Sequence, residues 1–437
     1  MIGRIIVAGG GTGGHLFPGI AVVEELRRRV PGLEVLFVGS PRGIEARVLP
    51  ERGERVELID VSPLKGRSAG ELLRGLGVLP AALARATALL RRERPDVVLG
   101  VGGYASGPML LAAATLGIPT AVLEQNARVG LTNKLLGRVV GRAYVTFPET
   151  AASFRAGRAH VCGNPVRRAF VDAALAAMAD PDGFEARARR IFVLGGSQGA
   201  KVLNETVPEA IARAGIAERG IEVLHQTGAA MRDEVQARYD ALGIKAEVVP
   251  FIDDMARAYA SAAFVIARAG ATTIAELCAV GRPSILVPYR HASDDHQGKN
   301  AEALARVGAA LAIREDELTV EGLAASLGEL ATNVTARRTM ADAARKLGRP
   351  DAAANIVDDL CAWLGCPPSE SDDDTPARRS VSPVAAAPSK PPPDDGADTK
   401  ARGRESKYRR PRARAVDAPH VVTSRLDALE LIPGPAD

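Results

Sequence analysis

Short apolar runs rich in β-branched residues alternate with longer helical patterns along most of the chain, and this alternation constrains the fold more than any other feature. Repeated strand, helix and strand patterns predict βα units around a parallel sheet. The pattern occurs in two series. The expected strands of the first series are 4–8, 35–38, 55–59, 97–99, 120–123 and 143–145, and those of the second are 191–194, 222–225, 247–250, 264–267, 284–287 and 310–313. The sequence therefore predicts an α/β protein with two Rossmann-like, doubly wound parallel-sheet domains.

Composition shifts and punctuating residues divide the chain. Glycine, asparagine and proline at 163–165 interrupt it between the two series, and residues 174–190 are expected to form a helical connection before the second sheet. Patterns at 334–347 and 352–364 predict two closing helices, and the proline-rich and basic sequence that follows predicts disorder. The expected parts are an N-terminal domain at 1–162, a C-terminal domain at 163–345, a helix that packs back toward the N-terminal domain at 346–365, and a disordered tail at 366–437.

The bulk composition argues against several classes of protein. The formal net charge is only +4 over 437 residues, so we expect no nucleic-acid partner. The apolar run after Arg4 is about four residues long, whereas a secretory signal core needs roughly 7–15, and no run reaches the roughly 18 apolar residues of a membrane span; we therefore expect a cytosolic chain. The cysteines lack metal-ligand spacing and the density of a disulfide scaffold, which predicts free thiols and no metal site. They are Cys162, Cys278, Cys361 and Cys366.

Glycine-rich stretches follow three of the expected strands, at 9–14, 100–108 and 193–204, and the helix after the first stretch is expected to start near Pro18. Glycine permits close backbone approach, and the N-terminus of a following helix attracts anions, so such junctions suit a diphosphate. The first stretch satisfies GxGxxG, but the second expected strand ends in FVGSPRG without the acidic residue of a dinucleotide site, and no Lys-Ser/Thr pair completes a P-loop. A purely structural role as a tight turn stays open for each stretch.

Polar residues gather at strand ends of the second series. A helix expected to begin near Thr272 carries Glu276 one turn later, where a carboxylate can accept two hydrogen bonds from a ribose diol. An ordinary first-turn glutamate is the alternative interpretation. The stretch DDHQGKNA at 294–301 adds His296, Gln297 and Asn300 at the side where open α/β sheets bind ligands. An apparent DxD at 180–182 is predicted to be a proline and glycine turn, not a metal site.

These motifs resemble, in sequence and in order, those of the MurG family of peptidoglycan glycosyltransferases, within glycosyltransferase family 28. They are GGGTGGHLFPG, GGYASGP, EQNARVGLTNKLL, GNPVR, GGSQGA, FIDDMA, RAGATTIAEL and DDHQGKNA, within residues 1–365. The resemblance implies a GT-B fold and inverting, metal-independent transfer of GlcNAc from UDP-GlcNAc to the C4 hydroxyl of MurNAc in lipid I, giving lipid II, without a cofactor. A UDP-GlcNAc 2-epimerase-like isomerase and a non-enzymatic nucleotide-sugar-binding protein are the alternatives.

The resemblance also implies which residues contact each substrate. The expected donor set is Thr12, Gly13, Gly14, Asn126, Arg167, Ser197, Ile252, Met255, Ala271, Thr272, Thr273, Glu276, His296 and Gln297, and the expected acceptor set is Gly14, His15, Tyr104, Ser106 and Asn126. An imidazole with an ordinary pKa of about 6.5 suits proton removal from the acceptor hydroxyl near neutral pH. His15 is therefore the first candidate for the catalytic base and Glu124 the second, while anchoring of the glycine stretch is the alternative role for His15.

A lipid acceptor implies contact with a membrane. Residues 71–94 are apolar with flanking arginines, and Lys134, Arg138 and Arg142 are expected to add a basic helix face; an apolar patch rimmed by cations is typical of interfacial binding. Burial of the 71–94 helix against the sheet is the alternative. We expect a peripheral protein on the cytoplasmic side of the anionic plasma (inner) membrane, with cell-wall synthesis or division proteins as further partners.

Overall fold

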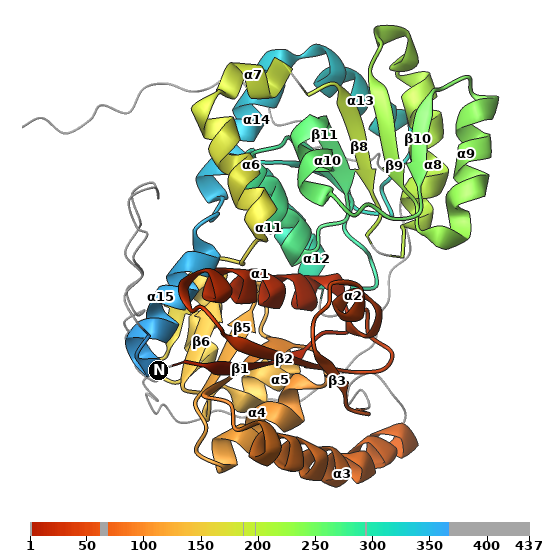
Figure 1. Cartoon of the computed structure of the whole chain (residues 1–437). Coiled ribbons are helices and arrows are strands. Elements are labelled where there is room, and N and C mark those ends of the chain that lie inside the picture. The colour runs from red at the N-terminus through yellow and green to blue at the C-terminus, as the bar shows by residue number, and fades with distance from the viewer. Residues whose placement is uncertain (1, 62–68, 187, 197, 293–294, 367–437) are drawn as a thin grey trace, which may run out of the picture. The chain divides into compact units, whose positions relative to one another are not determined.

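The computed structural model describes residues 2–61, 69–186, 188–196, 198–292 and 295–366, and only the backbone of 69–78. The expected tail beyond Cys366 lies outside the described residues. Within them the chain forms two parallel β-sheets flanked by helices (Figure 1). The predicted α/β class is therefore confirmed.

The first sheet has the strand order β3-β2-β1-β4-β5-β6-β7. Its strands are β1 Arg4–Gly9, β2 Glu34–Gly39, β3 Val56–Leu58, β4 Val97–Gly102, β5 Thr120–Glu124, β6 Arg142–Val145 and β7 Ala159–Val161. Ile5 of β1 pairs with Val35 on one side and with Val97 on the other, both in parallel. The order reverses between β1 and β4, so the loops that follow these two strands are neighbours, as at the ligand site of doubly wound sheets.

The second sheet repeats this plan with the order β10-β9-β8-β11-β12-β13. Its strands are β8 Arg190–Leu194, β9 Glu222–Gln226, β10 Ala246–Val249, β11 Ala262–Ala267, β12 Ser284–Leu286 and β13 Leu311–Ala312. Each predicted strand is present, with ends that shift by up to three residues. Strand β7 was not predicted, because its three residues, Ala-His-Val, give no apolar run to distinguish a strand from a loop.

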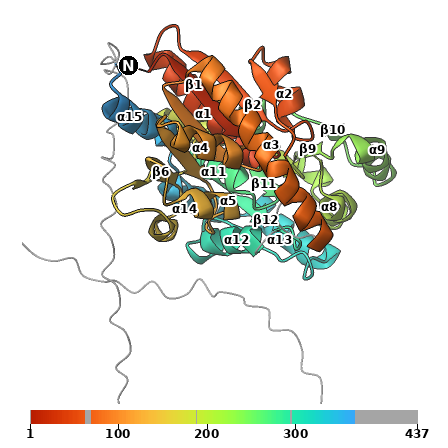
Figure 2. The ribbon, with the colours of Figure 1, turned by 90° about the horizontal axis from the view of Figure 1, so that it is seen from below.

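Helices cover both faces of each sheet, because alternate strand residues point to opposite sides. The helices around the first sheet are α1 Gly13–Arg29, α2 Glu45–Glu51, α3 Ala69–Glu93, α4 Ser106–Thr115, α5 Leu131–Leu136, η1 Pro148–Ser153 and α15 Ala352–Leu364. Ile5 packs with α1, α2 and α15, whereas Ile6 packs with α3 and α4. Figures 1 and 2 show α1 and α3 on opposite sides of this sheet.

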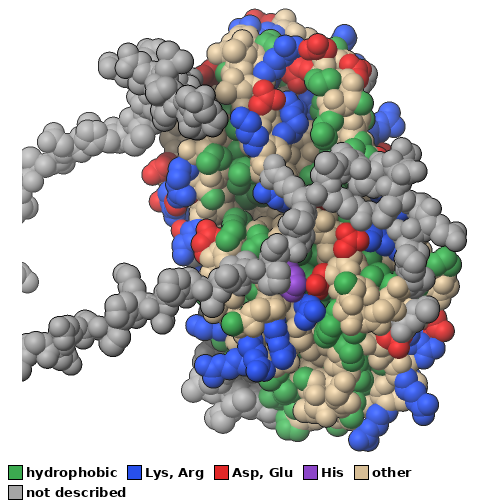
Figure 3. Space-filling view, turned by 90° about the vertical axis from the view of Figure 1, so that its left-hand side faces the viewer, with side chains coloured by type: hydrophobic (Ala, Val, Ile, Leu, Met, Phe, Trp, Pro, Cys, Tyr) green, Lys and Arg blue, Asp and Glu red, His purple; other side chains and the backbone are tan. Residues whose placement is uncertain are grey.

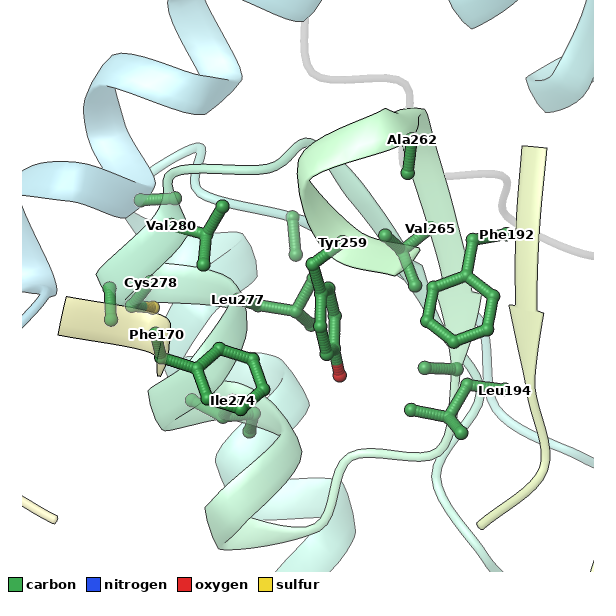
Figure 4. Close-up of a cluster of buried hydrophobic side chains, with 14 of the residues drawn as sticks. Phe170, Phe192, Leu194, Tyr259, Ala262, Val265, Ile274, Leu277, Cys278 and Val280 are labelled. Carbon is green, nitrogen blue, oxygen red and sulfur yellow. The ribbon is translucent and has the colours of Figure 1, made fainter. Parts of the chain in front are cut away.

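The second sheet is covered in the same manner. Its helices are α6 Arg168–Ala179, α7 Pro181–Ala186, α8 Lys201–Arg213, η2 Ala217–Arg219, η3 Ala229–Met231, α9 Arg232–Ala241, α10 Met255–Ser261, α11 Ala271–Val280, α12 His296–Arg306, α13 Val320–Thr332 and α14 Val334–Leu347. Phe192 of β8 packs with α6, α10 and α11, and Ile191 packs with α8, α9 and α13. In Figure 4 the Tyr259 ring lies between Phe170 and Phe192, with centroid distances of 5.6 and 5.4 Å.

The last two helices join different cores. Ala344 of α14 packs with the second sheet, whereas Ile356 of α15 packs with β1 of the first. Asp359 holds α15 to β6 by accepting hydrogen bonds from Tyr144 Oη at 2.8 Å and from Arg142 Nε at 3.0 Å. The predicted basic helix face is thus wrong for Arg142, which lies on a strand and is paired, and for Arg138, which lies in the turn after α5 Leu131–Leu136.

Three further expectations about helices are corrected. Helix α1 begins at Gly13, although the sequence suggested a start near Pro18, which lies inside the helix. The expected turn at 180–182 is instead the start of α7: Asp180 Oδ1 accepts from Gly183 N at 2.9 Å, and proline takes the first helical position. Helix α6 begins at Arg168, earlier than the helical connection expected from residue 174.

The apolar helix α3 is buried over its C-terminal half, where Ala82, Ala86 and Leu89 pack in the first core. The alternative of burial against the sheet therefore holds for this half, and side chains before residue 79 lie outside the described residues. None of the helices in the described ranges has the length and hydropathy needed to cross a bilayer.

The described cysteines are free thiols, and the surface shown in Figure 3 carries charges of both signs. The four cysteines are unpaired, and burial raises the pKa values of the Cys162 and Cys278 thiols to about 12. Figure 3 shows basic and acidic side chains interspersed with apolar ones in the upper part of the face it presents.

Candidate active site

One large cavity lies at the carboxyl ends of the strands of both sheets. Its volume is about 1970 Å³, and it is lined by the segments that follow β1, β2, β4 and β5 of the first sheet and β8, β10, β11 and β12 of the second. Pockets for a single drug-sized ligand measure about 300–1,000 Å³. The cavity therefore has room for two substrates, one beside each sheet.

The first two glycine stretches pack backbone against backbone. Gly10 N donates to Gly102 O at 3.1 Å. A Cβ on Gly9 would lie 2.0 Å from Gly102 O, and one on Gly103 would lie 2.4 Å from Gly10 O, so these glycines are required by the protein's own packing. Gly11, with φ +86°, has no atom within 4 Å of such a Cβ. The alternative expectation, that these glycines have a purely structural role in tight turns, therefore holds for much of these two stretches.

His15 lies in the first turn of α1 and lines the cavity. Its Nδ1 is 3.2 Å from Gly10 O, which can only accept, so Nδ1 carries the proton and the lone pair is on Nε2. Burial lowers the pKa of His15 below 6.5, and the charges of Glu124 and Glu45 partly oppose this shift. Anchoring and proton removal are thus compatible, because one ring nitrogen holds the loop while the other is a base.

Glu124, the second candidate for the base, accepts hydrogen bonds from the residues that follow it in the chain. Its Oε2 accepts from Gly130 N at 2.9 Å and from Asn133 Nδ2 at 3.0 Å, and its Oε1 accepts from Asn126 N at 3.1 Å. The carboxylate is buried. This arrangement suits a residue that orders the loop after β5 better than one that takes a proton from a substrate.

Of the other expected acceptor residues, Tyr104 and Asn126 line the cavity and Ser106 does not. Tyr104 is 51% exposed. Ser106 is the first residue of α4, and its hydroxyl is fully buried next to the position that a Gly100 Cβ would occupy. The Ser106 hydroxyl therefore does not face the cavity, because its side chain points into the packing between β4 and α4.

In the second domain, Glu276 and Arg167 form a pair within the cavity. Arg167 Nη2 donates to Glu276 Oε1 at 3.1 Å, and its guanidinium lies 4.4 Å from the ring centroid of Phe17 in α1. Burial raises the pKa of Glu276, and the charge of Arg167 opposes this shift. The core packing of α11 through Leu277 fixes the helix that carries this carboxylate (Figure 4).

The N-termini of α1 and α11 are in direct contact. Thr272 Oγ1 donates to Gly14 O at 3.1 Å. This carbonyl would accept from the N–H of residue 18 in a regular helix, but Pro18 has none. Because the proline leaves Gly14 O without an intrahelical donor, the hydroxyl from the other domain can satisfy it, and the two positively polarised helix ends face one space.

Most of the remaining expected donor residues also line the cavity: Thr12, Gly13, Gly14, Ile252, Met255, Ala271, Thr273, His296 and Gln297. Gln297 Oε1 accepts from Tyr289 N at 3.0 Å. Asn300 is buried and donates to Ala269 O at 3.1 Å, so it supports the site from behind. Ser197 lies outside the described residues. Among the described residues, no group of three or more His, Cys, Asp or Glu side chains is placed to hold a metal ion.

Comparison with known proteins identifies the family. Residues 5–145 match the glycosyltransferase family 28 N-terminal domain, and residues 190–356 match the family's C-terminal domain. A UDP-N-acetylglucosamine–N-acetylmuramyl-(pentapeptide) pyrophosphoryl-undecaprenol N-acetylglucosamine transferase of Anaeromyxobacter dehalogenans is 49% identical over 361 residues, or 83% of this chain and 93% of that protein. The chain belongs to glycosyltransferase family 28.

Solved structures agree with membership of family 28. The crystal structure of Acinetobacter baumannii MurG has a TM-score of 0.63 and 33% identity, and the match covers 82% of this chain and 99% of that one. A UDP-GlcNAc 2-epimerase from Neisseria meningitidis, bound to UDP-GlcNAc, has a TM-score of 0.58 over 82% of this chain and 99% of that one, but only 13% identity. The epimerase therefore shares the fold alone, and the GT-B fold expected from the sequence is confirmed.

Two features of this family 28 site were missed by sequence reasoning. Arg268 Nη1 donates to Glu315 Oε2 at 2.7 Å, and its guanidinium lies 5.3 Å from the Tyr289 ring centroid. Arg268 directly follows β11, and its position at a strand end was the available signal. Glu45, whose carboxylate lies behind the first glycine stretch, was missed because its hydrogen bond from Gly11 N joins residues that are 34 positions apart.

Proposed function

We propose that this chain transfers GlcNAc from UDP-GlcNAc to the C4 hydroxyl of MurNAc in lipid I, giving lipid II, with inversion and without a divalent metal ion. Its relatives at 46–49% identity carry the name of this transferase. The observation that carries the proposal is the meeting of α1 and α11 at one cavity, with His15 on one helix and Glu276 on the other. This arrangement supports a reaction between substrates held by different domains.

On the donor side, Glu276 would accept hydrogen bonds from the ribose hydroxyls. These would partly replace the hydrogen bond that it accepts from Arg167 Nη2. The first turn of α11, at Ala271, Thr272 and Thr273, would bind the diphosphate through backbone N–H groups and the helix dipole. The other expected donor contacts keep the roles that the resemblance implies: Ile252 and Met255 at the uracil and nucleoside, His296 and Gln297 at the sugar, and Ser197 at the diphosphate.

On the acceptor side, His15 Nε2 would take the proton of the attacking hydroxyl. The hydroxyl oxygen forms a bond to the anomeric carbon of GlcNAc while the bond from that carbon to the UDP oxygen breaks, so the configuration inverts and UDP leaves as an anion. Arg167 and the N-terminus of α11 would stabilise the charge that develops on the diphosphate. Tyr104 and Asn126 would contact the acceptor.

We further propose that the protein binds peripherally to the cytoplasmic face of the membrane through a patch formed by α5 and the turn that follows it. Leu131, Leu135 and Val139 are 47%, 67% and 46% exposed, and Lys134 and Arg138 lie between them in the sequence. Leu131 and Leu135 also line the cavity. Apolar contact with acyl chains, together with two cations, would bring the lipid-linked acceptor to the site.

The deciding experiment incubates the full chain with labelled UDP-GlcNAc and a short-chain lipid I analogue in EDTA. We expect label in the lipid product and release of UDP. The matched reaction without acceptor tests the isomerase alternative, which would convert UDP-GlcNAc alone. Turnover that EDTA abolishes, or conversion that needs no acceptor, would contradict the proposal.

A further inference from the structure

The Glu45 carboxylate is buried behind the first glycine stretch and accepts hydrogen bonds from two loops. Its Oε2 accepts from Gly11 N at 2.7 Å, and its Oε1 accepts from Ser40 N at 2.8 Å and from Ser40 Oγ at 3.2 Å. The residue is 1% exposed at the start of α2. A carboxylate thus fills an amide cradle of the kind that glycine loops offer to anionic ligands.

Three glycines make room for this one side chain. A Cβ on Gly10 would lie 2.5 Å from the carboxylate, one on Gly43 would lie 2.1 Å from it, and one on Gly39 would lie 2.2 Å from Glu45 Cγ. Glycine at these three positions therefore leaves the space that the Glu45 side chain occupies.

The position of Glu45 also limits where an anion can bind. The Gly10 and Gly11 amides are taken by Gly102 O and by Glu45, whereas Gly13 and Gly14 occupy the first turn of α1, where N–H groups have no intrahelical acceptor. A diphosphate at Gly11 would meet a negative charge, but at the start of α1 it would meet the positive helix end.

We propose that Glu45 is a positioning residue of the transfer reaction, which fixes the loop that carries His15 and directs the acceptor diphosphate to the N-terminus of α1. The inference rests on the proposed function for the identity of the acceptor and for the role of His15. Glu45 itself touches neither substrate, so its effect passes through Gly11 and the start of the helix.

The pKa of His15 provides a readout that would not change if Glu45 had only a structural role. Burial lowers the pKa of the His15 imidazole, and three titratable groups act on it: Glu124 at the end of β5 and Glu45 raise the pKa, and His296 at the start of α12 lowers it. Removing the charge of Glu45 should lower the pKa of His15, so the acid limb of the pH profile should move to lower pH.

The test compares Glu45→Gln and Glu45→Asp in the full chain, with Glu34→Gln as the matched control. Glutamine keeps the size but turns an NH₂ group toward an N–H donor. We expect kcat to fall about 10- to 100-fold, the scale for a misplaced catalytic group, with the KM for UDP-GlcNAc within about twofold. Glu45→Asp should restore the acid limb, and Glu34, half-exposed on β2 and paired with Arg4, should show no effect on substitution.

An unchanged kcat and acid limb in Glu45→Gln, with or without a lower Tm, would overturn the proposal. Titration of the His15 ring by NMR without substrate, assigned among the six histidines with His15→Gln, separates this failure from that of the proposed function. A wild-type chain that transfers no sugar refutes the function, whereas a His15 pKa that is equal in wild type and Glu45→Gln refutes the positioning role.

Discussion

The hydrogen bond from Thr272 to Gly14 O leads to a prediction about protein stability: the cost of removing the hydroxyl should depend on Pro18. Thr272→Val removes the hydroxyl that donates to Gly14 O at 3.1 Å while nearly conserving shape. In wild type, Pro18 cannot replace the lost donor, because it has no N–H. In a Pro18→Ala background, the alanine N–H can donate to Gly14 O and close a regular helical turn.

The loss of stability expected for Thr272→Val depends on whether Gly14 O keeps a hydrogen-bond donor. A buried acceptor left without a partner costs about 1–3 kcal/mol. Thr272 is 8% exposed, so water reaches the contact to a limited degree and we expect about 1–2 kcal/mol for Thr272→Val in the wild-type chain. In the Pro18→Ala chain we expect less than about 0.5 kcal/mol, because Gly14 O keeps a donor.

A double-mutant cycle measures this difference. Thermal unfolding of the four full-length proteins without ligand should show a Tm drop of about 2–8 °C for Thr272→Val alone, taking about 2–4 °C per kcal/mol for domains of this size, and a much smaller drop beside Pro18→Ala. Thr273→Val, at the neighbouring position of α11, is the control. Equal Tm drops in both backgrounds would refute the claim that Pro18 leaves Gly14 O to the other domain.

Three further predictions concern the chemistry. Gly102→Ala places a Cβ 2.8 Å from His15 Cδ2, at a residue whose φ is +95°. Steady-state kinetics should therefore show a kcat loss of about 10-fold or more, with the KM for the donor unchanged. A normal kcat would contradict the assigned position of His15. Glu276→Gln should weaken UDP binding about 10- to 100-fold by calorimetry, as for lost hydrogen bonds to a charged group, and unaltered affinity would refute a ribose contact. Because burial lowers the pKa of His15 below 6.5 and the base must be neutral, kcat/KM should fall only below that pH; a fall that begins at higher pH would exclude His15 as the base.

The fold was predictable because its signals are local. Strands such as β4 and β11 are continuous apolar runs, as buried parallel strands are, and helices 334–347 and 352–364 were predicted with their observed ends. The start of α1 was missed for a specific reason. Proline is typical of the first helical position, whereas Pro18 is accepted deeper in the helix because a threonine from the second domain satisfies the carbonyl it leaves.

The candidate site was predictable in part from residues near the ends of strands, although Arg268, which directly follows β11, was missed. It was unpredictable where the role of a residue depends on long-range packing. Glu276 and His15 follow strand ends and line the cavity as expected. Ser106 also follows a strand end, but the first turn of α4 rotates its hydroxyl into the core. Glu45 was missed because its bond to Gly11 joins residues that are 34 positions apart.

The glycine stretches show how such a site can bind a diphosphate. Their sequence suggests that loop amides hold the ligand, yet Gly9, Gly10 and Gly103 pack against other protein atoms, and in the second domain a Cβ on Gly199 would lie 1.8 Å from Thr227 O. The glycines therefore bring backbones together, and this packing sets where the next helix begins. The anion-binding capacity then belongs to the first turns of α1 and α11, so substitutions there should change substrate affinity, whereas substitutions of the packed glycines should first change stability.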